Sequence, residues 1–198
     1  LITSVCERKS VLKRPSAAQH SMDNGKEQVM VANVDYVFIV SSLNDNYNFN
    51  RIARYVSMTL QGNAIPVVIL TKADLCSNPG RYASEIENLS EQVKVHCVSA
   101  LYGIGMDELI KYLQPGKTIA ILGSSGVGKS TLVNALVQED VMKTSEIRES
   151  DAKGRHTTTH RQMIVLLNGA RIIDTPGMRE LGMCDMDQGI DDCLLYTS

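Results

Sequence analysis

"TIAILGSSGVGKSTLVNAL" (residues 118–136) is the stretch that decides the expected fold. It opens with an apolar run, as in a strand that is buried on both faces. Its last part places Leu132 and Leu136 four residues apart, which predicts one face of a helix. Between them, GSSGVGKS (123–130) matches the pattern G-x-x-x-x-G-K-[ST] at every required position. A strand and a helix joined by such a loop predict a site for a phosphate chain.

Each residue type in this loop suits phosphate binding. Glycines let backbone N–H groups turn inward around a phosphate, and the start of the next helix adds a positive dipole end. Lys129 would bring a charge to the β- and γ-phosphates, and the Ser130 hydroxyl would ligate Mg²⁺. The alternative is a glycine-rich turn with an incidental lysine. The predicted nucleotide-binding residues are Gly123, Ser124, Ser125, Gly126, Val127, Gly128, Lys129, Ser130 and Thr131.

IIDTPG (172–177) supplies further parts of such a site. Asp174, at the tip of an expected buried strand, would hold Mg²⁺ through water, and the Gly177 N–H would reach a γ-phosphate. Alone, Asp-Thr-Pro-Gly is also an ordinary turn. Its position downstream of the phosphate loop favours the functional interpretation.

GRHTTTH (154–160) lies between these two motifs. Its threonines could reflect β-propensity alone. They could also provide a hydroxyl that completes the Mg²⁺ shell only when a γ-phosphate is present, which would make the segment an order–disorder switch. Spacing does not decide between Thr158 and Thr159, and we prefer Thr159. The predicted metal ligands are therefore Ser130, Thr159 and Asp174.

VVILTKADL (67–75) is a candidate reader of the nucleotide base. The Asp74 carboxylate can accept two hydrogen bonds from guanine, whereas adenine would leave it unpaired at a cost of about 1–3 kcal/mol. The Lys72 stem can lie on the base face, and the Ala100 N–H in VSA (98–100) can donate to guanine O6. The bland alternative is a frayed strand end. The predicted base-binding residues are Thr71, Lys72, Ala73, Asp74, Ser99 and Ala100.

The rest of the chain alternates between strand-like and helix-like segments. VDYVFIV (34–40) and PVVILTKAD (66–74) predict buried strands, and FNRIARYVSMTLQGN (49–63) predicts a helix. Such alternation predicts a parallel sheet with helices on both faces. Asn168 and Gly169 predict a hairpin turn, and therefore one antiparallel edge strand. The expected fold class is α/β, with three layers around a mostly parallel sheet.

The order of the motifs is the most informative feature. In most GTPases the phosphate loop comes first, but here residues 71–74 and 98–100 precede residues 123–131. A helix expected at 107–114 runs directly into the strand at 118–122 and would join what are normally the two chain ends. The expected fold is thus a circularly permuted P-loop GTPase.

This order resembles the circularly permuted GTPases, and the motifs are similar to one family among them. NVDYVFIV, LTKADL, GSSGVGKSTLVNAL, GRHTTTHR and DTPGMREL resemble the bacterial ribosome small-subunit-dependent GTPase A family, which acts in late assembly of the 30S subunit. The resemblance covers about residues 30–190. One departure is Thr71, where many GTPases have an asparagine, which weakens the expected support around the base.

The resemblance implies a domain organisation. Residues 1–30, expected to be irregular, would be a remnant of an N-terminal OB-fold and linker, with basic residues near ribosomal RNA. Residues 31–190 would be the GTPase domain, and residues 191–198 do not continue the family pattern and could be non-native. The resemblance also implies a C-terminal zinc domain, which is expected to lie outside this chain, and zinc is expected only in that domain. The first residue is Leu1 rather than methionine, which indicates a fragment.

The resemblance also implies a reaction and partners. GTP or GDP and Mg²⁺ are the expected ligands, and the 30S subunit with its rRNA is the expected partner of a cytoplasmic monomer. Met178 stands where Ras-like enzymes place a glutamine that orients water, so intrinsic hydrolysis should be slow. His156 is a candidate replacement, brought in when docking on the 30S subunit orders residues 150–160. The predicted catalytic residues are His156, Thr159, Asp174 and Gly177.

Composition agrees with these expectations and leaves three alternatives. The net charge of -2 gives no global attraction to nucleic acid, and the five cysteines lack a Cys-x-x-Cys pair, which favours reduced thiols. No apolar run approaches the ~20 residues of a membrane span, and no signal peptide is visible. The alternatives are another permuted GTPase, an ATP-dependent kinase or ATPase, and a binding module that GTP only gates.

Overall fold

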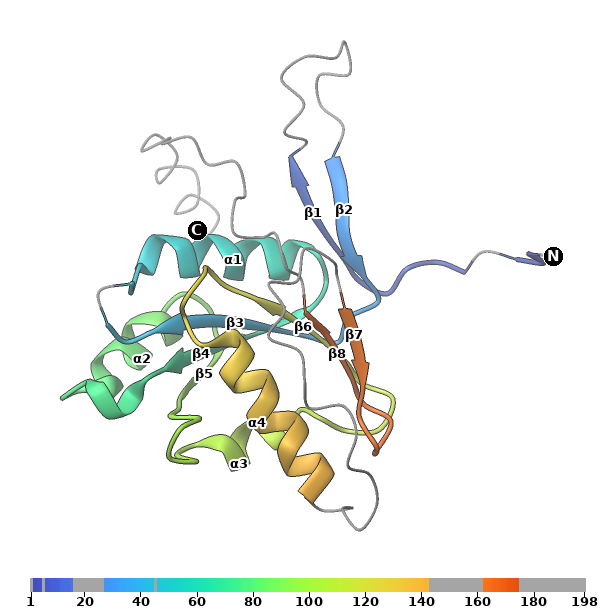
Figure 1. Ribbon diagram of the computed structural model, residues 1–198. Coiled ribbons are helices and arrows are strands. Elements are labelled where there is room, and N and C mark those ends of the chain that lie inside the picture. The colour runs from blue at the N-terminus through green and yellow to red at the C-terminus, as the bar shows by residue number, and fades with distance from the viewer. Residues whose placement is uncertain (1, 5, 16–26, 45, 143–161, 175–198) are drawn as a thin grey trace.

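The computed structural model describes residues 2–4, 6–15, 27–44, 46–142 and 162–174. Its main sheet contains β3 (Tyr36–Ser42), β4 (Ile65–Thr71), β5 (Lys94–Cys97), β6 (Thr118–Leu122), β7 (Gln162–Val165) and β8 (Arg171–Asp174). The helices are α1 (Phe49–Gln61), α2 (Pro79–Glu87), α3 (Met106–Ile110) and α4 (Lys129–Met142), with a short 3-10 turn, η1 (Ala73–Leu75). Figure 1 shows these elements around the sheet.

The sheet has the order β5-β4-β3-β6-β8-β7. All neighbouring strands run parallel except β7, which is antiparallel to β8 at the edge. The turn between them contains Asn168 and Gly169, and the Gly169 φ of 88° shows why a glycine stands there. The predicted sheet, with its single antiparallel edge strand, is confirmed.

Side chains of each central strand alternate between two cores, because successive residues of a strand point to opposite faces. In β3, Val37 and Ile39 pack into the core beneath α1 and α2, whereas Phe38 and Val40 pack into the core beneath α3 and α4. The helices therefore cover both faces, as Figure 1 shows. The three-layer arrangement expected from the sequence is confirmed.

One expectation for the first 30 residues is wrong. They were expected to be irregular, but β1 (Val11–Pro15) and β2 (Glu27–Ala32) form a separate antiparallel pair. Leu12 is fully buried against the core under α1. The pair also contacts the end of that helix: Val11 N–H donates to the Gly62 carbonyl at 2.9 Å, and a Cβ at Gly62 would lie 2.6 Å from the Val11 oxygen.

Asp35 fastens the start of β3 to the start of β6. Its carboxylate accepts hydrogen bonds from the Lys117 ammonium at 3.0 Å and the Thr118 N–H at 2.9 Å. Lys117 and Thr118 lie where the segment expected to join the two usual chain ends leads into β6, the strand that precedes residues 123–130. Partial burial disfavours the charged carboxylate, but these two donors outweigh it and hold the pKa of Asp35 below its ordinary value.

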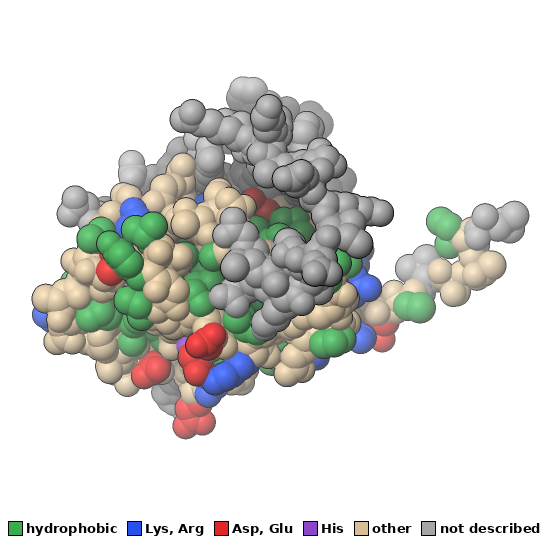
Figure 2. Space-filling model, turned by 60° about the horizontal axis from the view of Figure 1, so that its bottom comes forward, with side chains coloured by type: hydrophobic (Ala, Val, Ile, Leu, Met, Phe, Trp, Pro, Cys, Tyr) green, Lys and Arg blue, Asp and Glu red, His purple; other side chains and the backbone are tan. Residues whose placement is uncertain are grey.

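The surface carries charges of both signs. On the face shown in Figure 2, acidic and basic side chains of the described residues lie next to each other rather than in separate patches. Lys111 and Glu108 are one such pair, 2.6 Å apart. No helix in the described part of the chain has both the length and the apolar character that crossing a membrane requires.

Candidate functional site

The carboxyl ends of β4, β6 and β8 meet at one edge of the sheet, where open α/β folds bind ligands. The loop after β6 runs from Gly123 to Gly128, and α4 begins at Lys129, as predicted. Gly123, Gly126 and Gly128 have φ values of 150°, 77° and 93°. A Cβ at Gly123 would lie 2.4 Å from the Val40 carbonyl oxygen, so only glycine fits there. Hereafter we call residues 123–130 the phosphate loop.

Lys129 points back across the phosphate loop. Its ammonium donates to the Gly123 carbonyl at 2.7 Å and also to the Ser124 carbonyl. These contacts hold the positive charge within the loop that would surround a phosphate. Ser130 is exposed in the first turn of α4, so its hydroxyl is accessible to a ligand. Ser125 and Gly126 are exposed as well, at the tip of the loop.

The expected base reader is hydrogen-bonded to the phosphate loop. The Thr71 hydroxyl lies 2.6 Å from the Val127 carbonyl oxygen and 3.3 Å from the Ser41 carbonyl oxygen. The Lys72 ammonium donates to the Gly126 carbonyl at 3.3 Å. Thr71 is buried and thus supports the loop directly, although many GTPases have an asparagine at this position.

Lys72 has a φ of 58°, an uncommon conformation for a residue other than glycine. It turns the chain sharply out of β4, so that η1 begins at once. Asp74 lies in η1 with an exposed carboxylate, free to accept from a base edge. The conformation of Lys72 therefore accompanies both its contact with Gly126 and the exposure of Asp74.

The second segment predicted to bind the base lies beside the first. Val98 accepts a hydrogen bond from Ala73 N–H at 3.1 Å, which connects the end of β5 to η1. Ser99 and Ala100 follow β5, which ends at Cys97. Ser99 is fixed by paired backbone hydrogen bonds with Ile104, each 3.0 Å long.

Asp174 occupies the end of β8, in register with Ile121 of β6. Its Oδ1 atom is buried and has no hydrogen-bond partner within the described residues. A buried carboxylate oxygen without a donor is costly unless a cation or a bound water faces it. Oxygen ligands are those that Mg²⁺ prefers. Asp174 thus fits the predicted role near the phosphate loop, with Ser130 as the second described oxygen donor.

The structure adds one residue that the sequence did not single out. Arg51, in the first turn of α1, donates from Nη1 to the Ser124 hydroxyl at 2.9 Å. The helical pattern of residues 49–63 predicted only which side chains face the core. Arg51 is not one of them, although it directly precedes the buried Ile52. The only sequence signal for Arg51 was a cation next to a buried helical residue. That signal could not identify Ser124 as its partner, because Ser124 lies 73 residues away in sequence.

Four predicted residues lie outside the described part of the chain. They are His156, Thr158, Thr159 and Gly177. Their assignments stay predictions. Among the described residues, no group of three or more histidine, cysteine or acidic side chains could hold a metal ion. Cys6, Cys76 and Cys97 carry free thiols.

Comparison with known proteins settles the family. The profile of the RsgA GTPase family matches residues 5–184 of the chain. The chain belongs to the RsgA GTPase family. This agrees with the resemblance that the motifs carry.

Relatives within the RsgA family are similar over most of the chain. The small ribosomal subunit biogenesis GTPase RsgA of Methanosarcina acetivorans is 44% identical over 191 residues, 96% of this chain and 51% of the relative. RsgA 1 of Listeria innocua is 47% identical over 174 residues, 88% of this chain and 50% of the relative. The chain thus spans about half the length of these RsgA proteins.

Solved structures agree with the RsgA fold. YjeQ from Thermotoga maritima has a TM-score of 0.61 and 28% identity, covering 88% of this chain and 54% of YjeQ. YloQ, described as a circularly permuted GTPase, has a TM-score of 0.52 at 22% identity, covering 84% of this chain and 57% of YloQ, and so supports the fold alone. The predicted fold class, a circularly permuted GTPase fold, is confirmed.

Proposed function

We propose that this chain is a GTP-binding and GTP-hydrolysing switch that acts in late assembly of the 30S ribosomal subunit. The observation that carries the proposal is the hydrogen bonding of Thr71 and Lys72 to the phosphate loop. A base-reading segment held against a phosphate loop suits a ligand with both a base and a phosphate chain. Membership in the RsgA GTPase family favours GTP and GDP among such ligands.

The base would be read at the ends of β4 and β5. Asp74 accepts two hydrogen bonds from guanine, the Lys72 stem covers one face of the base, and the Ala100 N–H donates to guanine O6. Exposure of Asp74 and the connection between Ala73 and Val98 support this arrangement. An adenine base would leave the Asp74 carboxylate without its donors, so ATP would bind more weakly.

The phosphates would lie over the start of α4. Lys129 would leave the two loop carbonyls and bind the β- and γ-phosphates, while backbone N–H groups of the loop bind the remaining oxygens. Mg²⁺ would be held by Ser130, Thr159 and Asp174, and when bound it supplies positive charge to the phosphate oxygens. The Gly177 N–H would contact the γ-phosphate. The buried, unpartnered oxygen of Asp174 supports its part in this set.

Hydrolysis would be slow without a partner, because Met178 cannot orient a water molecule. His156 would take this task when residues 150–160 order on the ribosomal subunit. The printed names of the relatives support the small subunit as the partner. Cytoplasmic location, a monomeric state and the lack of a membrane contact are part of the same proposal.

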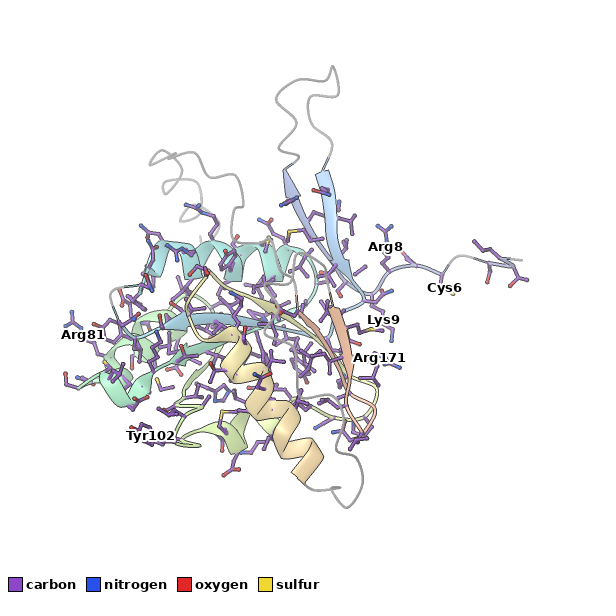
Figure 3. The ribbon with its side chains drawn as sticks, viewed as in Figure 1. Cys6, Arg8, Lys9, Arg81, Tyr102 and Arg171 are labelled. Carbon is purple, nitrogen blue, oxygen red and sulfur yellow. The ribbon has the colours of Figure 1, made fainter. Side chains whose placement is uncertain are left out.

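Basic side chains beside the main sheet support a contact with rRNA. Figure 3 shows Arg8, Lys9 and Arg171 on one side of the molecule. Lys117 forms an ion pair with Asp35, and Arg171 is joined to Lys117 by a backbone hydrogen bond. Clustered cations of this kind bind the phosphate backbone of a nucleic acid.

Single-turnover hydrolysis of GTP, with and without purified 30S subunits, tests the proposal. We expect slow Mg²⁺-dependent hydrolysis that the subunits accelerate, and loss of the acceleration in His156→Ala. Lys129→Ala controls for hydrolysis by contaminants. If the chain binds GTP but subunits never accelerate its hydrolysis, it is a binding module that GTP only gates. Full stimulation of His156→Ala would refute the role of His156.

A further inference from the structure

The first turn of α1 lies within side-chain reach of the phosphate loop. The Asn48 side chain caps this helix by accepting a hydrogen bond from Arg51 N–H at 2.8 Å. That cap fixes the backbone of Arg51. From there the guanidinium reaches the Ser124 hydroxyl, with an Nη1 to Oγ distance of 2.9 Å. Arg51 is half-buried, so this contact is not a solvated surface pair.

Ser124 is held from two directions. Arg51 binds its side-chain hydroxyl, and Lys129 binds its carbonyl oxygen. Nucleotide binding would draw Lys129 toward the phosphates and away from that carbonyl. The bond from Arg51 does not have to break, because it reaches the side chain of Ser124 rather than the backbone. The hydrogen bond from Arg51 would then hold the conformation of the phosphate loop at Ser124.

No acidic residue that the structure describes neutralises the charge of Arg51. Within the described part of the chain, Arg51 forms no ion pair with an acidic side chain. A half-buried guanidinium next to the phosphate loop therefore raises the positive potential at the place where a nucleotide brings several negative charges. Lys72 and Lys129, whose ammonium groups bind carbonyls of the same loop, add to this potential.

We propose that Arg51 is a positioning residue of the phosphate loop, which holds Ser124 in place and strengthens nucleotide binding. The inference deepens the proposed function, on which it rests, but it concerns the phosphate chain rather than the base. It therefore applies to GDP and GTP alike. The role of Arg51 does not depend on which base is bound. If residues 71–74 did not distinguish guanine from adenine, Arg51 would strengthen the binding of ADP as much as that of GDP.

Titration of the chain with fluorescent GDP tests the proposal. Arg51→Ala should weaken binding about tenfold, because a charged donor and its hydrogen bond are lost. Arg51→Lys should recover part of the loss through its charge, although its ammonium cannot reproduce the planar guanidinium. Arg54→Ala is the matched control, since Arg54 is an exposed arginine one turn along the same helix. It should bind GDP within about twofold of the unmodified chain.

A double-mutant cycle with Ser124→Ala shows whether the contact itself matters. Ser124→Ala should weaken binding less than Arg51→Ala, and adding it to Arg51→Ala should have no further effect. Thermal unfolding of the nucleotide-free variants shows whether the fold is preserved. If Arg51→Ala also lowers that melting temperature, its weaker binding could come from a damaged fold. Ser124→Ala, which removes a single oxygen, then tests the contact, and weaker GDP binding by this variant supports the proposal. Binding by Arg51→Ala within twofold of the unmodified chain, or additive effects of the two changes, would overturn the proposal.

Discussion

The Thr71 hydroxyl donates a hydrogen bond to the Val127 carbonyl across 56 residues of sequence, over a distance of 2.6 Å. It connects the end of β4, where the proposed base reader begins, to the middle of the phosphate loop. The two motifs therefore form one unit rather than two neighbouring loops. A nucleotide that binds one of them meets the other at a defined separation.

Replacing Thr71 with valine tests this connection. The change keeps the shape of a buried side chain but leaves the Val127 carbonyl without its donor. We expect a loss of about 1–3 kcal/mol in the free energy of unfolding, together with weaker GDP binding. Urea unfolding and fluorescence titration measure the two effects.

Thr71→Ser is the matched control, because it keeps the hydroxyl and removes one methyl group. We expect it to lose about 1 kcal/mol of stability through packing and to retain GDP affinity. If Thr71→Val binds GDP as well as Thr71→Ser does, the bond to Val127 does not position the nucleotide.

Gly123→Ala should destabilise the protein before any ligand is considered. The added Cβ would lie 2.4 Å from the Val40 carbonyl oxygen, and that backbone belongs to the central strand β3. We expect a cost of about 3 kcal/mol or more, read from urea unfolding. Gly103→Ala, which has a φ of 69° and open space for a Cβ, should cost only about 1 kcal/mol. Equal costs at both positions would contradict the packing at Gly123.

Asp174→Asn should abolish the effect of Mg²⁺ on GTP affinity. The neutral amide lacks the negative charge with which a carboxylate attracts Mg²⁺. The change also removes a charge from a buried oxygen that lacks a partner, so the nucleotide-free protein should be no less stable than before. Titration of GTP with and without Mg²⁺, combined with thermal unfolding, checks both results. A large loss of stability would mean that Asp174 has a structural role instead.

Asp35 should make stability depend on pH in the acid range. Partial burial alone would raise the pKa of Asp35, but Thr118 and Lys117 lower it below the ordinary value of 3.8. Asp35 therefore stabilises the fold fully above pH 3.8, and this stabilisation is lost as the pH falls through the lowered pKa. Urea unfolding of Asp35→Asn should show a deficit at neutral pH that disappears on acidification.

Glu108→Gln is the control for this pH effect. Glu108 pairs with Lys111 within one helix, and both side chains are exposed. Exposed pairs contribute little to stability, so this variant should unfold like the unmodified chain at neutral pH. A deficit in Glu108→Gln as large as in Asp35→Asn would show that general charge effects, rather than the Asp35 contacts, govern the acid range.

Local sequence patterns predicted most of the central fold. The apolar runs that became β3, β4 and β6 needed no tertiary information, and Asn168 with Gly169 predicted the antiparallel edge. The phosphate loop was predicted because the pattern G-x-x-x-x-G-K-[ST] between a strand and a helix is rarely found without a phosphate-binding role. The order of motifs was enough to predict the permutation, since order is a property of the sequence itself.

What the sequence did not predict depends on contacts between distant residues. β1 and β2 were missed because their apolar residues form only short runs, at 11–12 and 29–32, although Leu12, Met30 and Val31 belong to the core. The helix expected at 107–114 ends at Ile110, after which 3-10-type hydrogen bonds of Tyr112 and Leu113 lead to Pro115. Arg51 was missed because its partner Ser124 belongs to another motif.

The most direct test of the account is competition of GDP and ADP for the chain in the presence of Mg²⁺, read with a fluorescent guanine nucleotide. The account predicts that GDP competes much more strongly than ADP, and that Asp74→Ala removes the difference while Thr71→Ser retains it. Equal competition by GDP and ADP would contradict it. Residues 71–74 would then be only the end of β4, and the phosphate loop would bind nucleotides without reading their base.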